Sequence, residues 1–213
     1  APYDTGLTGA YCTGKILGSQ LLTGDPSQYL TGARIQGGID LDLALETGVG
    51  TVPVTLERDE SGRIVFGRMA QPVPRVESAG SPEAVLASVG AERSLLPIEL
   101  YDNGARHIVV TLEEGELRAL RPDSETIAGF GVTGVNCVAR DGASWRSRMF
   151  WEHGEDPATG SAAGPIACHL ARHGLVAWGE EIVIAQGVEM GRPSALHARA
   201  EGGEGLIDAV EVG

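Results

Sequence analysis

The residues best suited to chemistry lie together in one stretch, Gly154–Pro165, with the sequence GEDPATGSAAGP. Its small side chains let a ligand approach the backbone closely, and Glu155 and Asp156 bring two carboxylates to the start of an expected helix. Amides at a helix N-terminus, here at about Gly160–Ala163, direct N–H groups and the positive end of the helix dipole towards a bound anion. With Asp156 beside them to exchange a proton, these residues predict a site for a monoanionic carboxylate, where proton transfer needs no cofactor.

Two other interpretations of the same stretch compete with this one. In the first, it is only a helix entrance, with Thr159 or Ser161 as the cap and the two acids complementing the helix dipole. In the second, it is a phosphate loop. It lacks the lysine of GxxxxGK(S/T), however, its glycines lie one residue too far apart, and its carboxylates would repel a polyphosphate. The sequence leaves the first interpretation open and disfavours the second.

Three histidines are weaker candidates for a functional role. His169 and His173 stand four residues apart and could share a helix face, as metal ligands do, but no HExxH motif or third ligand accompanies them in the sequence. A helix end whose dipole they complement is the favoured interpretation, so no metal site is expected. His107 opens an apolar strand, where a structural histidine is favoured over a catalytic one.

The cysteines and two arginines give no sign of chemistry. The three cysteines, Cys12, Cys137 and Cys168, form no CxxC or other close pair, which argues against a disulfide framework and favours a reducing cytoplasm. Cys137 and Cys168 stand in apolar surroundings that are typical of inert buried thiols. Arg146 and Arg148 alternate on one strand face, which is more typical of a solvated or domain-facing edge than of an anion clamp.

The overall composition excludes several classes of protein. The 213 residues carry 16 Lys and Arg against 29 Asp and Glu, a net charge of −13 that would repel nucleic acid and anionic membranes. With 42% hydrophobic and 21% charged residues, the chain fits a soluble protein of one large domain or two small ones. No run of about 18 apolar residues predicts a membrane span. The 31 glycines and 11 prolines favour many turns between short strands over a helical bundle.

Local signals predict a hairpin and a helix ahead of the GEDPATGS stretch. Residues 51–70 alternate in strand fashion around a short glycine-containing loop, which predicts two paired strands. A helix is expected over residues 82–89, with Ser81 as N-cap, Pro82 at its first position and Gly90 as its stop.

A break in the pattern over residues 71–80 predicts a domain boundary. It would divide the chain into a partial N-terminal domain, residues 1–72, and a C-terminal domain, residues 73–213, which carries the EDPATGSAAGP motif. The first fifty residues show scattered glycines and no clean periodicity before LDLALETG.

A second helix is expected over residues 162–173. Gly174 would stand just past its end, and Leu170 and Leu175 are spaced for the apolar contact of a Schellman stop. Pro165 would then lie in or next to the first turn, where a missing amide hydrogen has least effect. Strands are expected at 107–112, 134–139 and 145–150, in EEIVIAQG and in ALHARAEG, with a weak helix near 124–128.

The motif EDPATGSAAGP resembles the signature of the phenazine-biosynthesis PhzF-like isomerase family. Further segments resemble members of that family: NGARHIVVTL, NCVARDGASWRSRMF, HLARHGL, QGVEMGRPS, and LETGVGTVPVTLE followed by AQPVP. The resemblance extends from about Leu45 to the C-terminus.

The resemblance implies an α+β fold like that of diaminopimelate epimerase, with two similar domains that each wrap a curved β-sheet around a central helix. It implies a homodimer that uses no cofactor and no metal and moves a proton on a cyclic amino acid, trans-2,3-dihydro-3-hydroxyanthranilate in the phenazine pathway. This substrate is a small-molecule carboxylate. By motif matching, Asp156 corresponds to the family's catalytic aspartate, and Gly160 and Ser161 correspond to its carboxylate-binding turn.

Two motifs of the family are not found in these 213 residues. One is the Asn-Leu-Ser-Glu-type motif with the general-base glutamate, which is therefore expected outside this chain. The other is Gly-His-Pro, whose spacing matches Gly24-Asp25-Pro26 and would place Asp25 in the substrate site, while another register would supply Lys15. The sequence thus resembles a family member shortened at both ends.

Three functions follow as hypotheses. The first is an isomerase of the PhzF type. The second is a catalytically silent homologue that keeps the carboxylate-binding turn without the acid/base pair. The third is an amino-acid racemase or epimerase of the same fold, whose two-cysteine design places a thiol at the helix-start turn, where this sequence has TGSAA.

Overall fold

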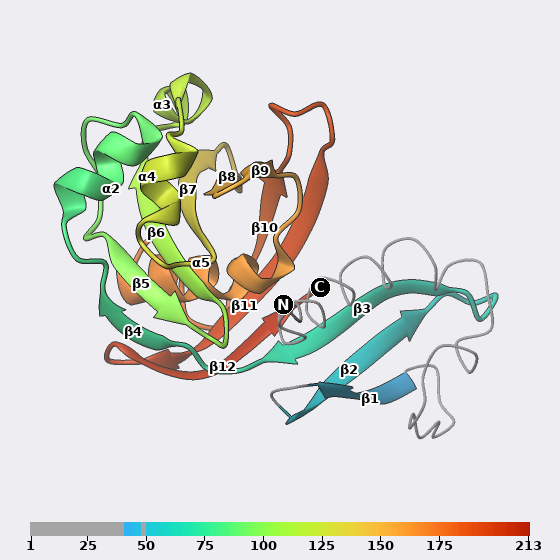
Figure 1. Ribbon diagram of the computed structural model, residues 1–213. Coiled ribbons are helices and arrows are strands. Elements are labelled where there is room, and N and C mark those ends of the chain that lie inside the picture. Colours follow the sequence, from blue (N-terminus) through green and yellow to red (C-terminus); the bar gives the residue numbers. More distant parts are fainter. Residues whose placement is uncertain (1–40, 48–49) are drawn as a thin grey trace, which may run out of the picture.

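The computed structural model describes residues 41–47 and 50–213, which form one mixed β-sheet and four helices (Figure 1). The strands are β1 Leu41–Thr47, β2 Gly50–Arg58, β3 Ile64–Gln71, β4 Arg75–Ser78, β5 Glu99–Asp102, β6 Arg106–Leu112, β7 Gly134–Asp141, β8 Ser144–Trp151, β9 Gly154–Asp156, β10 Glu181–Gln186, β11 Ser194–Gly203 and β12 Leu206–Val212. Their order in the sheet is β1-β2-β3-β12-β11-β10-β8-β7-β6-β5-β4, with β9 paired to β8. Neighbours are antiparallel, except that β6 runs parallel to β7 and β8 parallel to β10.

The helices divide between the two faces of the sheet. They are α2 Pro82–Val89, α3 Glu114–Ala119, α4 Ser124–Ala128 and α5 Gly160–Arg172. The sheet curves around α5, whereas α2, α3 and α4 gather on the other side of β6 and β7 (Figure 1). No helix in the described part of the chain is long and apolar enough to cross a membrane.

Burial on both faces explains why β6 is an almost continuous apolar run. Val109 belongs to the core around α5, whereas Ile108 and Val110 belong to the core under α2, α3 and α4. Successive side chains of a strand point to opposite faces, so apolar residues are required at every position when both faces are covered. The central strands are thereby fixed between two hydrophobic cores.

Helix α5 is buried over residues 162–171, which is why its sequence is rich in Ala and Gly. A Cβ at Gly164 would overlap the side chains of Gln71 and Val210, so this position lets the helix approach β3 and β12 closely. The helix ends as predicted: Gly174 has a φ of +73°, and the Leu175 amide donates to the Leu170 carbonyl at 2.9 Å.

Most local predictions are confirmed. Strands β2 and β3 form the expected hairpin, and the predicted strands at 107–112, 134–139 and 145–150 correspond to β6, β7 and β8. The first helix has Ser81 at its N-cap, accepting from the Ala84 amide, and a left-handed Gly90 at its end. Strands β1, β4, β5, β9 and β12 and helix α3 have no counterpart among the predicted elements.

The prediction for Pro165 was wrong. Helix α5 begins at Gly160, two residues earlier than expected, so Pro165 lies inside the helix rather than in its first turn. A proline there has no amide hydrogen for the carbonyl four residues earlier, that of Ser161. That carbonyl instead accepts from Asn103 Nδ2 at 3.0 Å, so a distant side chain supplies the missing donor.

The α+β class is confirmed, and α5 is the sheet-wrapped helix of the region 73–213. The proposed boundary between residues 72 and 73 falls in the connection from β3 to β4. Since β3 pairs with β12, the sheet continues from one side of this boundary to the other. The division into domains 1–72 and 73–213 stays a prediction.

Candidate active site

Asp156 stands at the end of β9, just before α5, and only 5% of its surface is exposed. Thr159 occupies the N-cap position of α5, yet its side chain makes no capping bond to the helix amides. Its hydroxyl Oγ1 instead donates to Asp156 Oδ2 at 2.7 Å. The cap hydroxyl is thus turned away from the helix start and holds the carboxylate.

Gln186, the last residue of β10, sets the direction of this bond. Its Nε2 donates to the Asp156 backbone carbonyl at 2.7 Å and to Thr159 Oγ1 at 2.9 Å. Its Oε1 accepts from Ser147 Oγ at 3.3 Å and from the Thr159 backbone amide at 3.4 Å, and because that amide can only donate and the Asp156 carbonyl can only accept, the orientation of the Gln186 amide is fixed. Because Thr159 Oγ1 already accepts from Gln186, its own hydrogen is available for Asp156.

The first residues of α5 are anchored through their carbonyls and one side chain. Gln71 Nε2 donates to the Gly160 carbonyl at 2.9 Å, and Asn103 Nδ2 donates to the Ser161 carbonyl. Ser161 Oγ lies 3.0 Å from His107 Nε2. These contacts fix the helix start from β3, the β5–β6 turn and β6, and none of them uses a first-turn amide.

The helix-entrance interpretation does not describe this geometry. Thr159 bonds Asp156 rather than the helix, and Glu155 pairs with Arg148 through two bonds, Nε to Oε1 at 2.9 Å and Nη2 to Oε2 at 2.7 Å. The residues expected to cap the dipole have other partners. The amides at the start of α5 suit a ligand anion instead.

Asp156, Gly160 and Ser161 all lie where β9 leads into α5, and their roles in the site stay predictions, whereas Asp25 lies outside the described residues. No local pattern in the sequence indicates that Thr159 and Gln186 are partners of Asp156, or that His107 contacts Ser161. The signal available was the resemblance of NGARHIVVTL and QGVEMGRPS to family segments, which contain His107 and Gln186.

The two arginines of β8 are not on a solvated edge, so that part of the prediction was wrong, and the domain-facing position stays a prediction. Both have side chains about nine-tenths buried, and they pair with Glu189 and Glu155. The hydrogen bonds that Arg148 donates to Glu155 raise the pKa of Arg148, outweighing the effect of burial. A buried strand face carries charge here because each guanidinium has its own carboxylate.

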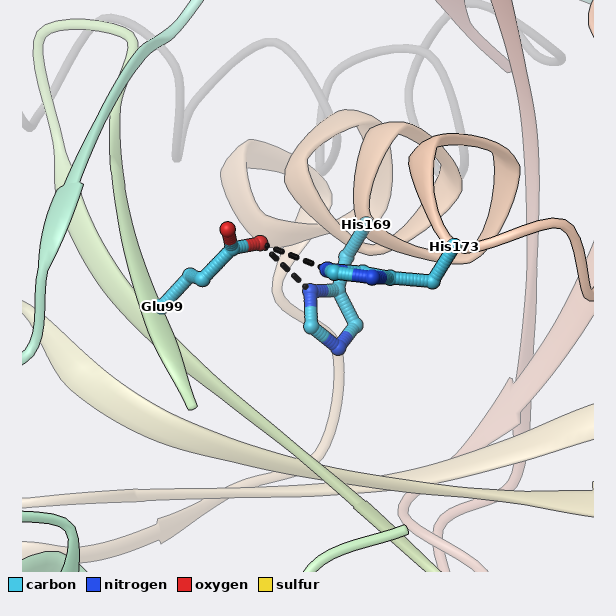
Figure 2. A group of neighbouring side chains, drawn as sticks. All are labelled: Glu99, His169 and His173. Carbon is cyan, nitrogen blue, oxygen red and sulfur yellow. Dashed lines mark hydrogen bonds and ion pairs between the residues drawn. The ribbon is translucent and has the colours of Figure 1, made fainter. Parts of the chain in front are cut away.

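A second polar cluster lies at the other end of α5 (Figure 2). Glu99 Oε2 lies 3.3 Å from His169 Nδ1 and 3.0 Å from His173 Nε2, and the three ligand atoms all lie within 4.8 Å of one another. The third group missing from the sequence pattern is thus supplied by β5. By residue type these atoms could hold a divalent metal ion.

The charge of the surroundings argues against a metal ion in this cluster. Arg172 Nη1 and the Tyr101 hydroxyl donate to the same oxygen, Glu99 Oε2, at 2.8 and 2.7 Å. Burial raises the pKa of Glu99, but the bonds from His169, His173, Tyr101 and Arg172 outweigh it and hold the pKa well below its ordinary range. A cation would have to displace a guanidinium, so the group acts as a closed hydrogen-bond network that joins α5 to β5.

The two cysteines among the described residues, Cys137 and Cys168, are both buried, as predicted. Burial raises the pKa of the Cys168 thiol to about 12 and raises that of Cys137 further. A thiolate nucleophile at neutral pH is disfavoured in both cases. The described part of the site therefore offers oxygen and nitrogen groups, not sulfur, for proton transfer.

Comparison with known proteins assigns this chain to a family. Residues 32–212 match the family described as Phenazine biosynthesis-like protein. The chain belongs to this family. The match begins before Leu45, where the resemblance in the sequence starts, and so includes part of the region without clear periodicity.

The curated relatives of this family member carry one name. The chain is 48% identical to the trans-2,3-dihydro-3-hydroxyanthranilate isomerase of Pseudomonas aeruginosa and 45% identical to that of Pseudomonas chlororaphis. Each comparison covers 190 residues, 86% of this chain and 68% of the relative.

Solved structures show the same fold. A PhzF-family protein from Bacillus anthracis has a TM-score of 0.68 at 20% identity, and the match covers 83% of this chain and 65% of the Bacillus anthracis chain. A predicted epimerase from Pseudomonas aeruginosa has a TM-score of 0.71 at 24% identity, over 92% and 68% of the two chains. A hydroxyproline epimerase from Agrobacterium vitis has a TM-score of 0.54 at 14% identity, over 95% and 60%. The epimerase-like α+β fold expected from the sequence is thereby confirmed.

Proposed function

We propose that this protein is an isomerase with the substrate that its curated relatives are named for, trans-2,3-dihydro-3-hydroxyanthranilate. It moves a proton on this cyclic amino acid without a cofactor. The observation that carries the proposal is that the Thr159 hydroxyl donates to Asp156 and does not cap the helix amides. One residue thereby fixes an acid/base group and leaves an anion site beside it. The names of relatives at 45 to 48% identity support the same reaction.

Each site residue has a proposed role. The amides of Gly160 and Ser161, at the positive end of the α5 dipole, hold the substrate carboxylate. Asp156 takes part in the proton exchange, held in position by Thr159. A proton leaves one ring carbon and is returned at another, so the isomerisation needs no oxidant or reductant.

Further parts of the proposal concern the whole protein. The chain spans 68% of the length of its curated relatives and 65% of the Bacillus anthracis structure, so the complete activity is proposed for the protein and not for the described residues alone. A homodimer in the cytoplasm is part of the proposal. So is a place for Asp25 in the substrate site.

The test is proton NMR of the purified protein with trans-2,3-dihydro-3-hydroxyanthranilate in D₂O, with the intact mass of the protein measured on the same sample. The proposal predicts loss of substrate with incorporation of deuterium from solvent at a ring carbon. A full-length protein, confirmed by its intact mass, that binds the substrate but gives neither turnover nor deuterium exchange contradicts the proposal and indicates a ligand-binding homologue.

A further inference from the structure

Behind Ser161, two fully buried polar side chains form a line that leads into the core. His107 of β6 lies with Nε2 at 3.0 Å from Ser161 Oγ and with Nδ1 at 3.2 Å from Asn136 Nδ2 on β7. Neither His107 nor Asn136 has measurable exposure. Neither residue has a place in the reaction as described above.

The backbone fixes the direction of these hydrogen bonds. Asn136 Nδ2 also lies 3.3 Å from the Ile108 carbonyl, which can only accept, so the Asn136 atom facing His107 is a donor. His107 Nδ1 is then the acceptor. Burial lowers the pKa of His107 to about 4, so the ring is neutral at pH 7 and carries its single hydrogen on Nε2.

The consequence falls on the Ser161 hydroxyl. Ser161 Oγ accepts from His107 Nε2, so the hydroxyl does not point its own hydrogen at this ring, and it can donate to a ligand. A carboxylate accepts such a bond at either of its two charged oxygens, whereas a neutral primary amide has one uncharged carbonyl acceptor and an NH2 end that cannot accept it. We propose that Asn136, His107 and Ser161 form a relay that fixes the Ser161 hydroxyl as a donor, so that His107 positions it to select a carboxylate. The inference rests on the carboxylate site of the proposed function.

This orientation of Asn136 leaves one of its polar atoms without a hydrogen-bond partner among the described residues. Its Oδ1 is buried and has no hydrogen-bond partner among the described residues. A buried acceptor left without a donor is destabilising. The amide nevertheless keeps Nδ2 on His107 and Ile108, as the relay requires.

The first test is the tautomer of His107 in the unmodified protein. The chain has 5 histidines, so ¹⁵N-labelled protein at pH 7 allows the ring nitrogens to be assigned through long-range ¹H–¹⁵N correlations. The relay predicts an Nε2–H tautomer for His107. An Nδ1–H tautomer or an imidazolium would overturn it, and this outcome needs no variant to fold.

The second test compares two inert probes, anthranilate and anthranilamide, by calorimetry. The wild type should bind the carboxylate more tightly than the amide. His107→Leu should weaken anthranilate binding about 5–10-fold, the value of one hydrogen bond to a charged group, and change anthranilamide binding less than about twofold. In a Ser161→Ala background the same substitution should have no further effect, because the hydroxyl it orients is gone.

His107→Gln is the matched control, since its amide can still donate to Ser161 and should restore the preference for anthranilate. Equal affinity of the wild type for both probes would overturn the relay, as would additive effects of His107→Leu and Ser161→Ala. If His107→Leu does not fold, the tautomer and the loss of preference in Ser161→Ala still decide. Binding needs no turnover, so a failure of the isomerase proposal is seen separately.

Discussion

A carboxylate lies at each end of helix α5, the partly buried Glu99 at one end and the buried Asp156 at the other, but only one end has the arrangement of a ligand site. At the C-terminal end, one oxygen of Glu99 accepts from Tyr101, Arg172 and two histidines, and the guanidinium balances its charge. At the N-terminal end, Asp156 Oδ2 takes the hydroxyl that would otherwise cap the helix. A polar cluster can bind a ligand when its hydrogen-bond donors are not already used by acceptors within the cluster, whatever residue types it contains.

The strongest test of this comparison replaces each carboxylate in turn. Asp156→Asn keeps the shape of the side chain but removes its proton exchange, so turnover should fall by roughly 10²–10⁴-fold while the protein stays folded. The measurement is the D₂O NMR assay, with thermal unfolding as the control for folding. Glu99→Gln is the matched variant, and its turnover per folded molecule should stay within about twofold of wild type, since Glu99 contacts no proposed site residue.

An undiminished rate in Asp156→Asn would remove Asp156 from the mechanism. A large loss of rate in folded Glu99→Gln would instead show that the two ends of α5 are coupled.

The buried histidine behind Ser161 predicts a dependence of stability on pH. The folded pKa of His107, about 4, lies below its ordinary value of 6.5, so between these values the unfolded chain binds a proton that the folded chain does not. The contribution of His107 to the free energy of unfolding is therefore fully present above pH 6.5. It falls as the pH is lowered, by roughly 3 kcal/mol at pH 4. Urea unfolding from pH 7 to 4.5 should show this slope, and His107→Gln should flatten it. An equal slope in both proteins would assign the effect to another group.

Breaking the Glu99 network should lower the stability of the protein without lowering its catalytic turnover. Glu99→Gln removes the charge opposite Arg172, and because both side chains are partly exposed we expect a destabilisation of about 2 kcal/mol. The pKa of Glu99 is held below its ordinary range, so its contribution is complete above the unfolded value, about 4.3, and is lost as the pH falls below it. Denaturant unfolding at pH 7 and pH 3 checks both points, since the two proteins should differ less at pH 3.

A smaller effect is expected from the hydroxyl that distinguishes the N-terminal end. Thr159→Val keeps the shape and removes the bond to Asp156, so kcat should fall about tenfold with KM changed less, since one hydrogen bond to a charged group is lost. Thr159→Ser keeps the hydroxyl and should retain most of the rate. Equal rates in the valine and serine variants would show that the hydroxyl does not position the carboxylate.

Elements with local signals could be predicted from the sequence. Ser81, Pro82 and Gly90 mark both ends of α2, and the turn between β2 and β3 marks the hairpin. The stretch that begins α5 was likewise found from its small residues and carboxylates. In each case the residues that fix the conformation are neighbours in the chain.

The rest depends on contacts between distant segments. Gln186 reaches Asp156 across 30 residues, and Glu99 reaches His169 across 70. Pro165 is tolerated inside α5 because Asn103, 58 residues from Ser161, supplies a donor to the Ser161 carbonyl. No local pattern contains such partners, so the closed cluster at one end of α5 and the fixed serine at the other could only be seen in the fold.

The most direct test of the account is a titration of ¹⁵N-labelled protein with anthranilate, followed through the backbone amide resonances. The ligand carboxylate is expected on the first turn of α5, so the largest shifts should occur at the amides of Gly160 and Ser161, with little change at His169 and His173. Saturable binding that leaves the Gly160 and Ser161 amides unmoved would contradict it.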